Sequence, residues 1–140
     1  MNHWLLDTGP LVAYLASADP AHGEVAAVLD GFGGQLSTTC AVVTEAMHFV
    51  APSPTGPTLL AEFVTSARVR VFDLAQPADL RAAAVLMERY SDTPMDFADA
   101  TLVLLAGNLD CLDVLTLDRR GFSTYRAAGN RPFRLVLDYR

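Results

Sequence analysis

The sequence predicts an α/β protein: a three-layer α/β/α sandwich in which a central, mainly parallel sheet is covered by helices on both faces. Two observations lead to this prediction. Short apolar runs alternate along the chain with longer segments whose apolar residues recur at helical spacing. The short runs are apolar at nearly every position, which is typical of strands buried on both faces of a parallel sheet. The 140 residues are expected to form a single domain, residues 1–140.

In the first half of the chain, turn and capping residues mark the ends of the predicted elements. The sequence Asp7-Thr8-Gly9-Pro10 is a turn signal that follows the first apolar run. Thr38 or Thr39 fits an N-cap, because a threonine hydroxyl accepts hydrogen bonds from the first turn of a helix. We expect strands at residues 3–6 and 35–37, and helices at 10–16, 21–29, 40–50 and from Pro57 to about 67.

In the second half, prolines mark two helix starts. Pro77 and Pro94 both fit the first helical position, where the missing backbone N–H costs no hydrogen bond. Short apolar runs rich in valine and leucine then predict the remaining strands. We expect helices at residues 77–90 and 94–107, and strands at 68–72, 114–117 and 133–137.

Composition limits the possible classes of protein. Hydrophobic residues make up 51% of the chain and charged residues 19%, so we expect a well-filled core and no extended disorder. The net charge is −6, from 10 basic and 16 acidic residues, and gives no overall attraction for a nucleic acid. A polyanionic substrate would therefore need a local basic patch, metal ions or a partner chain.

The cysteines and the N-terminal segment bear on the cellular compartment. Cys40 and Cys111 stand in apolar contexts without metal-ligand spacing, and we expect two buried thiols in a reducing compartment. The N-terminal segment lacks the basic residues of a signal peptide. No apolar run approaches the ~18 residues that a membrane span needs. These features predict a cytoplasmic protein that does not associate with a membrane.

Acidic residues in four separate segments are candidates for one functional site. Asp7 and Asp118 follow predicted strands, and ligand sites in parallel sheets form outside the carboxyl ends of the strands. Each also has a purely structural interpretation, since both fit turns or helix caps. Glu45 shares a helix face with Thr44 and His48, which is equally consistent with a stripe exposed to solvent.

Two further acids stand three residues apart at the start of the apolar segment PMDFADATLVLLAG. Asp96 fits the N3 position of a capping box with Thr93 as N-cap and Pro94 at N1. Asp99 is then expected to lie past that cap, among apolar neighbours. No Lys or Arg in the segment offers it a partner, so metal binding is the simplest explanation for Asp99.

A divalent cation accounts for the five acids together. Carboxylates that converge without a counter-charge repel one another and resist ionisation. Mg²⁺ and Mn²⁺ prefer oxygen ligands, and are usually held by a few carboxylates together with phosphate oxygens of a substrate. One or two such ions activate water and stabilise the charge that develops in phosphoryl displacement. The acids therefore predict a Mg²⁺ or Mn²⁺ site.

The motifs LLDTGPLVA, TEAMHF, MDFADATLVLLA and VLTLDRRGF occur in an order that resembles the PIN-domain ribonucleases, particularly the VapC-type toxins of toxin–antitoxin pairs. The resemblance extends over nearly the whole chain. It implies a Rossmann-like α/β/α sandwich with an Asp, a Glu and two further Asp around Mg²⁺ or Mn²⁺. These correspond to Asp7, Glu45, Asp99 and Asp118. Asp96 matches an additional acid found in members with a Met-Asp-x-Ala-Asp-Ala motif.

The resemblance implies a Mg²⁺- or Mn²⁺-dependent endoribonuclease that hydrolyses single-stranded RNA, inhibited by a cognate antitoxin. Thr8 and Thr116 match positions where small hydroxyl residues occur in the family; they would either orient a ligand or water, or simply complete a turn and a strand. The apolar helices at 40–50 and 59–67 also predict a homodimer with a groove for the antitoxin. The alternative is a degenerate PIN-like domain that only binds RNA or protein, which the complete set of acids disfavours.

Two other classes share single features with the chain. Leu6-Asp7-Thr8-Gly9 contains the aspartic-protease tripeptide, but that chemistry needs two such loops in β-rich lobes. A receiver domain needs a lysine, and the sequence contains none. For contacts with RNA phosphates, the nearest basic candidates are Arg119, Arg120 and Arg126, which equally fit a solvated turn and helix.

Overall fold

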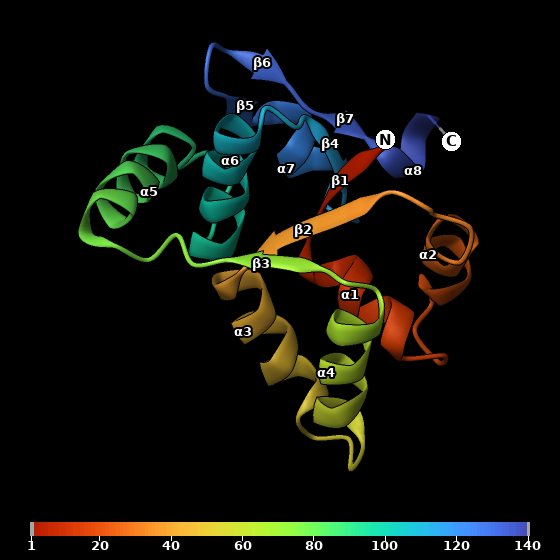
Figure 1. Cartoon of the computed structure of the whole chain (residues 1–140). Helices are drawn as coiled ribbons and strands as arrows, with labels where there is room; N and C mark the ends of the chain where they lie inside the picture. Colours follow the sequence, from red (N-terminus) through yellow and green to blue (C-terminus); the bar gives the residue numbers. More distant parts are fainter. Residues whose placement is uncertain (1, 140) are drawn as a thin grey trace.

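The computed structural model describes residues 2–139 and has the predicted α/β architecture. Strands and helices alternate along the chain (Figure 1). The strands are β1 (His3–Leu6), β2 (Gln35–Thr39), β3 (Arg70–Phe72), β4 (Asp113–Leu115), β5 (Arg126–Ala127), β6 (Arg131–Pro132) and β7 (Arg134–Leu135). The helices are α1 (Thr8–Leu15), α2 (His22–Leu29), α3 (Cys40–Val50), α4 (Gly56–Ser66), α5 (Pro77–Arg89), α6 (Phe97–Leu109), α7 (Arg119–Thr124) and α8 (Val136–Tyr139).

The central sheet has five strands in the order β3-β2-β1-β4-β7. Every neighbouring pair in it is parallel; Leu5, for example, lies opposite Ser37 of β2 on one side and Val114 of β4 on the other. From β1 the chain continues to β2 and β3 on one side, whereas β4 and β7 lie on the other side. The strand order therefore reverses next to β1, and such a reversal is where open α/β sheets form ligand sites.

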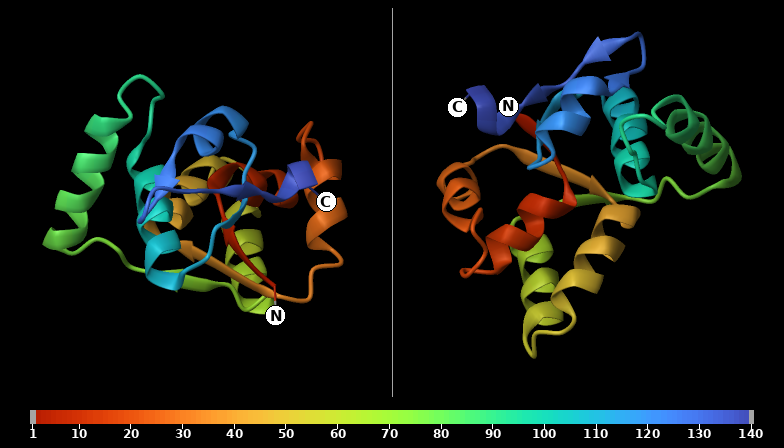
Figure 2. Two further views of the ribbon diagram at one scale, coloured as in Figure 1. Left: turned by 90° about the horizontal axis from the view of Figure 1, so that it is seen from above. Right: turned by 180° about the vertical axis from the view of Figure 1, so that it is seen from behind.

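Successive residues of the central strands point to opposite faces of the sheet, as the period of two requires. Leu5 and Val114 belong to one buried cluster, whereas their neighbours Leu6 and Leu115 belong to the other. Figures 1 and 2 show α5, α6 and α7 on one side of the sheet, and α1, α3 and α4 on the opposite side. The prediction of a sandwich with helices on both faces is confirmed.

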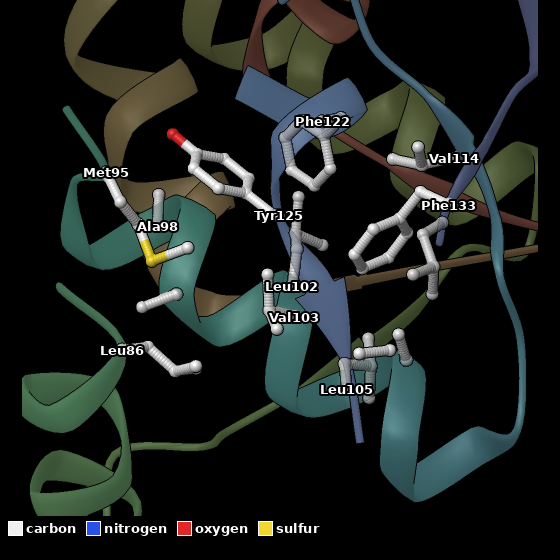
Figure 3. Packing of buried hydrophobic residues seen from close by; sticks show 14 of the residues in the cluster. Leu86, Met95, Ala98, Leu102, Val103, Leu105, Val114, Phe122, Tyr125 and Phe133 are labelled. Atoms are coloured by element: carbon white, nitrogen blue, oxygen red, sulfur yellow. The ribbon is translucent and has the colours of Figure 1, made fainter. Parts of the chain in front are cut away.

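Helix α6 is buried along most of its length and forms the centre of one cluster. Leu102 is fully buried, and the Thr101 hydroxyl is 2.8 Å from the Thr39 hydroxyl at the end of β2. Figure 3 shows the rings of Phe122, Tyr125 and Phe133 packed near this helix. Phe122 makes edge-to-face contacts with both other rings, at centroid distances of 5.2 and 5.3 Å. This packing anchors the N-terminal end of α6 against the sheet.

The start of α6 differs from the prediction. The helix begins at Phe97 rather than at Pro94, and Asp96 is its N-cap in place of Thr93. The reason is a hydrogen bond of 2.9 Å that the Tyr125 hydroxyl donates to the Pro94 carbonyl oxygen. This bond ties to Tyr125 a carbonyl that a helix starting at Pro94 would use within its first turn, and the backbone of Asp96 is extended (φ −86°, ψ 177°).

Three other expectations need correction. The last strand was expected at residues 133–137, but β7 covers only Arg134–Leu135 and the chain then turns into α8. The small antiparallel pair β5–β6 was not predicted, because two-residue strands carry no readable periodicity. Cys111 is buried as expected, whereas Cys40 is exposed, because the first residue of α3 faces solvent.

Within residues 2–139, none of the helices has both the length and the apolar character that crossing a membrane requires.

The burial of α6 leads to a test of the core. We expect Leu102→Ala to lower the free energy of unfolding by about 2–5 kcal/mol, because it leaves a cavity between α6 and the sheet. Leu104→Ala, at a half-buried position on the same helix, is the matched control and should cost clearly less. Urea unfolding followed by circular dichroism measures both. Equal losses would contradict the central position of α6.

Candidate active site

A cavity of about 490 Å³ opens at the carboxyl ends of the central strands. Asp7 comes directly after β1, and Thr116 and Asp118 come after β4. Helix α3, which carries Glu45, follows β2. The residues that line this acid cavity are Asp7, Thr8, Gly9, Val12, Asp19, Glu45, Phe49, Asp96, Asp99, Leu117 and Asp118. The structure therefore brings all five predicted acids into one cavity, and their roles in binding or catalysis stay a prediction.

Asp7 is held rigidly at the end of β1. Its backbone N–H donates to the Leu115 carbonyl oxygen at 3.0 Å, which extends the pairing of β1 with β4 by one residue. Its Oδ1 accepts from the Thr8 backbone N–H at 2.8 Å, and its Oδ2 accepts from the Thr116 hydroxyl at 2.7 Å. Asp7 is also the N-cap of α1, so the structural interpretation of this residue applies, and its role as a metal ligand stays a prediction.

Thr116 links two of the acids. Its hydroxyl oxygen accepts a hydrogen bond of 2.9 Å from the Asp118 backbone N–H. Its proton is directed at Asp7 Oδ2, so the hydroxyl fixes the positions of Asp7 and Asp118 relative to one another. Asp118 in turn caps α7, where its Oδ1 accepts from the Gly121 N–H at 3.0 Å. A Cβ atom on residue 121 would lie 2.2 Å from Asp118 Oδ2, so this arrangement requires glycine.

Asp96 and Asp99 form a reciprocal capping box at the start of α6. Asp96 Oδ1 accepts from the Asp99 N–H at 2.8 Å, and Asp99 Oδ2 accepts from the Asp96 N–H at 3.2 Å. The prediction that Asp99 lies past the cap is therefore wrong: it occupies N3 of the box. The error arose because the helix was predicted to start at Pro94, which placed Asp99 too far along it. The Asp99 side chain nevertheless lines the acid cavity.

Glu45 reaches the cavity from the middle of α3 and is half-buried. The exposed stripe expected for this helix holds for Thr44 and His48, which line a neighbouring groove with Cys40. Glu45 and Asp96 line both the groove and the acid cavity, which are therefore continuous.

Burial and neighbouring charges raise the pKa of two of the acids, Asp7 and Asp99. Burial raises the pKa of Asp7 from 3.8 to about 6, against the opposing effect of its hydrogen bonds from Thr116 and Thr8. Burial, followed by the charges of Asp7 and Asp96, raises the pKa of Asp99 from 3.8 to about 8. The Tyr125 pKa is raised by burial and then by the surrounding carboxylates. These carboxylates are thus close enough to interact, and none of the described residues that line the cavity is basic.

The donor set fits a hard divalent cation in its chemistry, because every acid offers only oxygen ligands. The Thr8 hydroxyl oxygen is buried without a hydrogen-bond partner among the described residues and lines the same cavity. As the side chains stand, however, no group of three or more His, Cys, Asp or Glu in residues 2–139 is arranged to hold an ion. Several of the carboxylate oxygens are engaged in helix caps, which keeps them apart.

Two lining residues, Asp19 and Phe49, were not identified from the sequence. Asp19 caps the turn before α2, where its Oδ1 accepts from the Ala21 N–H at 2.8 Å. Asp19 neither follows a strand nor belongs to a recognisable motif, so no local signal identifies it. Phe49 ends the motif TEAMHF, and its spacing of four residues after Glu45 is the signal that could have placed it on the same helix face. Their position depends on how α1 and α3 pack together.

Of the three arginines expected near the site, two are engaged elsewhere. Arg119 forms ion pairs with Glu24 and Asp138, and Arg126 donates to the last backbone carbonyls of α7. Arg120 is exposed. Of the three, Arg120 is therefore the candidate that remains for contact with an RNA phosphate.

Comparison with known proteins places the chain in a family, although no protein-family model matches it. Ribonuclease VapC26 of Mycobacterium tuberculosis is 31% identical over 134 residues, which cover 94% of this chain and 98% of VapC26. The chain belongs to the VapC family of PIN-domain ribonucleases. The resemblance found in the sequence motifs is thereby confirmed.

The VapC fold is also present in a crystal structure. VapC20 of Mycobacterium tuberculosis, a toxin that cleaves the sarcin–ricin loop, superposes with a TM-score of 0.74 at 18% sequence identity. The match covers 84% of this chain and 91% of VapC20. The aspartic-protease alternative does not fit a VapC fold, because Asp7-Thr8-Gly9 opens helix α1 at the end of a parallel strand.

The raised pKa values predict how stability depends on pH. Between pH 3.8 and about 8 the folded protein without metal holds more protons on Asp7 and Asp99 than the unfolded chain does. Its stability is therefore greatest below this window and falls as the pH rises through it. We expect Asp99→Asn to flatten this fall in melting temperature, measured in the presence of a chelator. Glu62→Gln, an exposed acid on α4, should leave the slope unchanged, and equal slopes for both variants would contradict the coupling.

The capping box predicts different effects for two substitutions of Asp96. Asp96→Asn keeps an oxygen that accepts from the Asp99 N–H, so we expect stability to be nearly unchanged. Asp96→Ala removes the cap and should cost about 1 kcal/mol of unfolding free energy. Both should reduce the rise in melting temperature that Mn²⁺ produces, measured by differential scanning fluorimetry. If Asp96→Asn keeps the full Mn²⁺ effect, Asp96 is a cap and not a ligand.

Proposed function

We propose that this VapC protein is a Mg²⁺- or Mn²⁺-dependent endoribonuclease that hydrolyses single-stranded RNA and acts as the toxin of a toxin–antitoxin pair. The observation that carries the proposal is the convergence of Asp7, Glu45, Asp96, Asp99 and Asp118 on one cavity at the carboxyl ends of the strands. The raised pKa values of Asp7 and Asp99 support it, because carboxylates kept this close without a counter-charge suit a cation.

Asp7, Glu45, Asp99 and Asp118 are the proposed catalytic residues and would hold the ion, with Asp96 as an additional ligand. The ion, when bound, would polarise a phosphate oxygen and lower the pKa of a water molecule. To close around it, carboxylates such as Asp99 would rotate away from the backbone N–H groups that they now cap. Asp7 stays in place, because the sheet and Thr116 hold it from two directions. Arg120 would contact the RNA backbone.

The proposal extends to partners and compartment. An RNA substrate and a VapB-type antitoxin follow from membership of the VapC family. A homodimer is supported by large apolar side chains that remain exposed on two helices, Leu59 on α4 and Val85 on α5. We also propose a cytoplasmic protein, in keeping with its two free cysteines.

The decisive test is metal-dependent cleavage by protein free of antitoxin. We expect single-stranded RNA to be cut in Mg²⁺ or Mn²⁺ and left intact after a chelator is added. Asp99→Asn should abolish cutting, and it should remove most of the stabilisation by Mn²⁺, which is about 2.7 kcal/mol in the native protein at one hundred times the dissociation constant. Asp92→Asn, an exposed aspartate outside the cavity, is the matched control and should behave as the native protein does.

Two outcomes would overturn this proposal. Cleavage that persists in chelator, or in Asp99→Asn, would separate the reaction from the acids. RNA binding without cleavage in any divalent ion would favour the alternative function, a degenerate PIN-like domain that binds RNA or protein.

A further inference from the structure

One aromatic side chain faces the acid cavity without a partner in the core. The Phe49 side chain is 59% exposed, yet it lines the cavity together with Glu45 and Asp99. Other large hydrophobic side chains are as exposed, but within residues 2–139 Phe49 alone among them borders this cavity. The exposed residues of this kind are Phe49, Leu59, Val71, Leu80, Val85 and Tyr139.

The packing of the protein does not account for Phe49. The residue belongs to neither of the two hydrophobic clusters formed by the described residues. The ring contact found for it is an edge contact with the exposed His48, at a centroid distance of 5.8 Å. A ring held at the rim of a cavity with most of its surface in water is available to a ligand.

The position of Phe49 relative to the acids is set by helix geometry. Phe49 follows Glu45 by four residues on α3, so both side chains lie on one face, about 6 Å apart along the axis. On α1, Val12 follows Thr8 by the same interval and also lines the cavity. Each helix thus presents a polar group and, one turn further along, an apolar side chain. The cavity combines oxygen ligands with an apolar surface.

The chemistry of this surface selects its occupant. None of the described residues that line the cavity is basic, so the rim beside Phe49 offers no side chain that would pair with a phosphate. Arg119 and Arg126 are engaged elsewhere, which leaves little positive charge to attract RNA. A nucleobase is uncharged and has a flat face, and proteins commonly bind unpaired bases by stacking them on aromatic rings.

We propose that Phe49 is a stacking platform for an unpaired nucleobase of the RNA, next to the phosphate that lies at the acids. This rests on the proposed ribonuclease function and adds a determinant of substrate choice to it. The ring binds a base that is splayed out of a helix, so RNA whose bases are paired at the cut site is a poor substrate. Glu45 and Phe49 then act on neighbouring parts of the same nucleotide unit.

The test compares RNA cleavage by native protein and variants on matched substrates. After the cut site in a single-stranded RNA is mapped in Mn²⁺, oligonucleotides are made with an abasic nucleotide on either side of it. We expect Phe49→Ala to lower kcat/KM on intact RNA by roughly 5- to 150-fold, the range found for one base–aromatic stack. Phe49→Trp should retain activity. Leu80→Ala, also exposed but on α5 outside the cavity, should match the native protein.

The abasic substrates identify the ligand. The native protein should cut one of them poorly, because the base that stacks on Phe49 is absent. Phe49→Ala should cut this RNA no more slowly than the native protein does, because removing the ring as well loses no further contact. If the loss of the base and the loss of the ring each lowered kcat/KM by its own factor, and the two factors multiplied, the base would not stack on Phe49 and the proposal would be overturned. Native activity of Phe49→Ala on intact RNA would also overturn it. If Phe49→Ala kept native activity but was no longer inhibited by the cognate antitoxin, the ring would instead be part of a protein interface.

A binding measurement separates this inference from the proposed function. RNA with 2-aminopurine in place of the stacked base should lose fluorescence on binding native protein, and should not do so with Phe49→Ala. If no RNA is cut in Mg²⁺ or Mn²⁺ but this quenching depends on Phe49, the platform stands and the nuclease proposal fails. If RNA is cut and the quenching is the same in both proteins, the nuclease stands and the platform fails.

Discussion

The pairing of β1 with its two parallel neighbours is the constraint on which the rest of the structure depends. β1 lies between β2 and β4, and Leu5 and Leu6 bury their side chains on opposite faces of the sheet. The pairing continues through the backbone of Asp7 and then through its carboxylate, which accepts from Thr116. Asp7 is thus held by the sheet itself, and the other acids of the cavity lie around it.

The sheet and the acids could be predicted because each leaves a local signal. Apolar runs mark the strands, and turn residues such as Asp7 mark their carboxyl ends. The start of α6 could not be predicted, because Thr93-x-x-Asp96 and Asp96-x-x-Asp99 are both plausible capping boxes. The structure forms the second box, and Tyr125, which lies 31 residues beyond Pro94, donates to the Pro94 carbonyl oxygen. This tertiary contact has no counterpart in the local sequence.

The composition of the site was less predictable than its location. No motif includes Asp19, and although Phe49 follows Glu45 by one helical turn, its exposure at the cavity depends on the packing of α1 against α3. The same holds for acidity: the pKa of Asp99 rises because the fold buries it beside Asp7 and Asp96. The exposure of Cys40 likewise depends on how α3 is turned, since its sequence context is apolar. Local patterns indicate which residue types are present, and packing sets their environment.

Three helices begin at the acid cavity, with Asp7, Asp96 and Asp118 as the N-caps of α1, α6 and α7. The N-terminus of a helix carries a partial positive charge from its aligned peptide dipoles, up to roughly half an elementary charge for a long helix. The backbone therefore supplies part of the positive charge that the side chains lack, and it does so before any ion binds. The helix ends thus offset part of the repulsion among the carboxylates. The repulsion that they leave, added to burial, raises the pKa of Asp7 and Asp99.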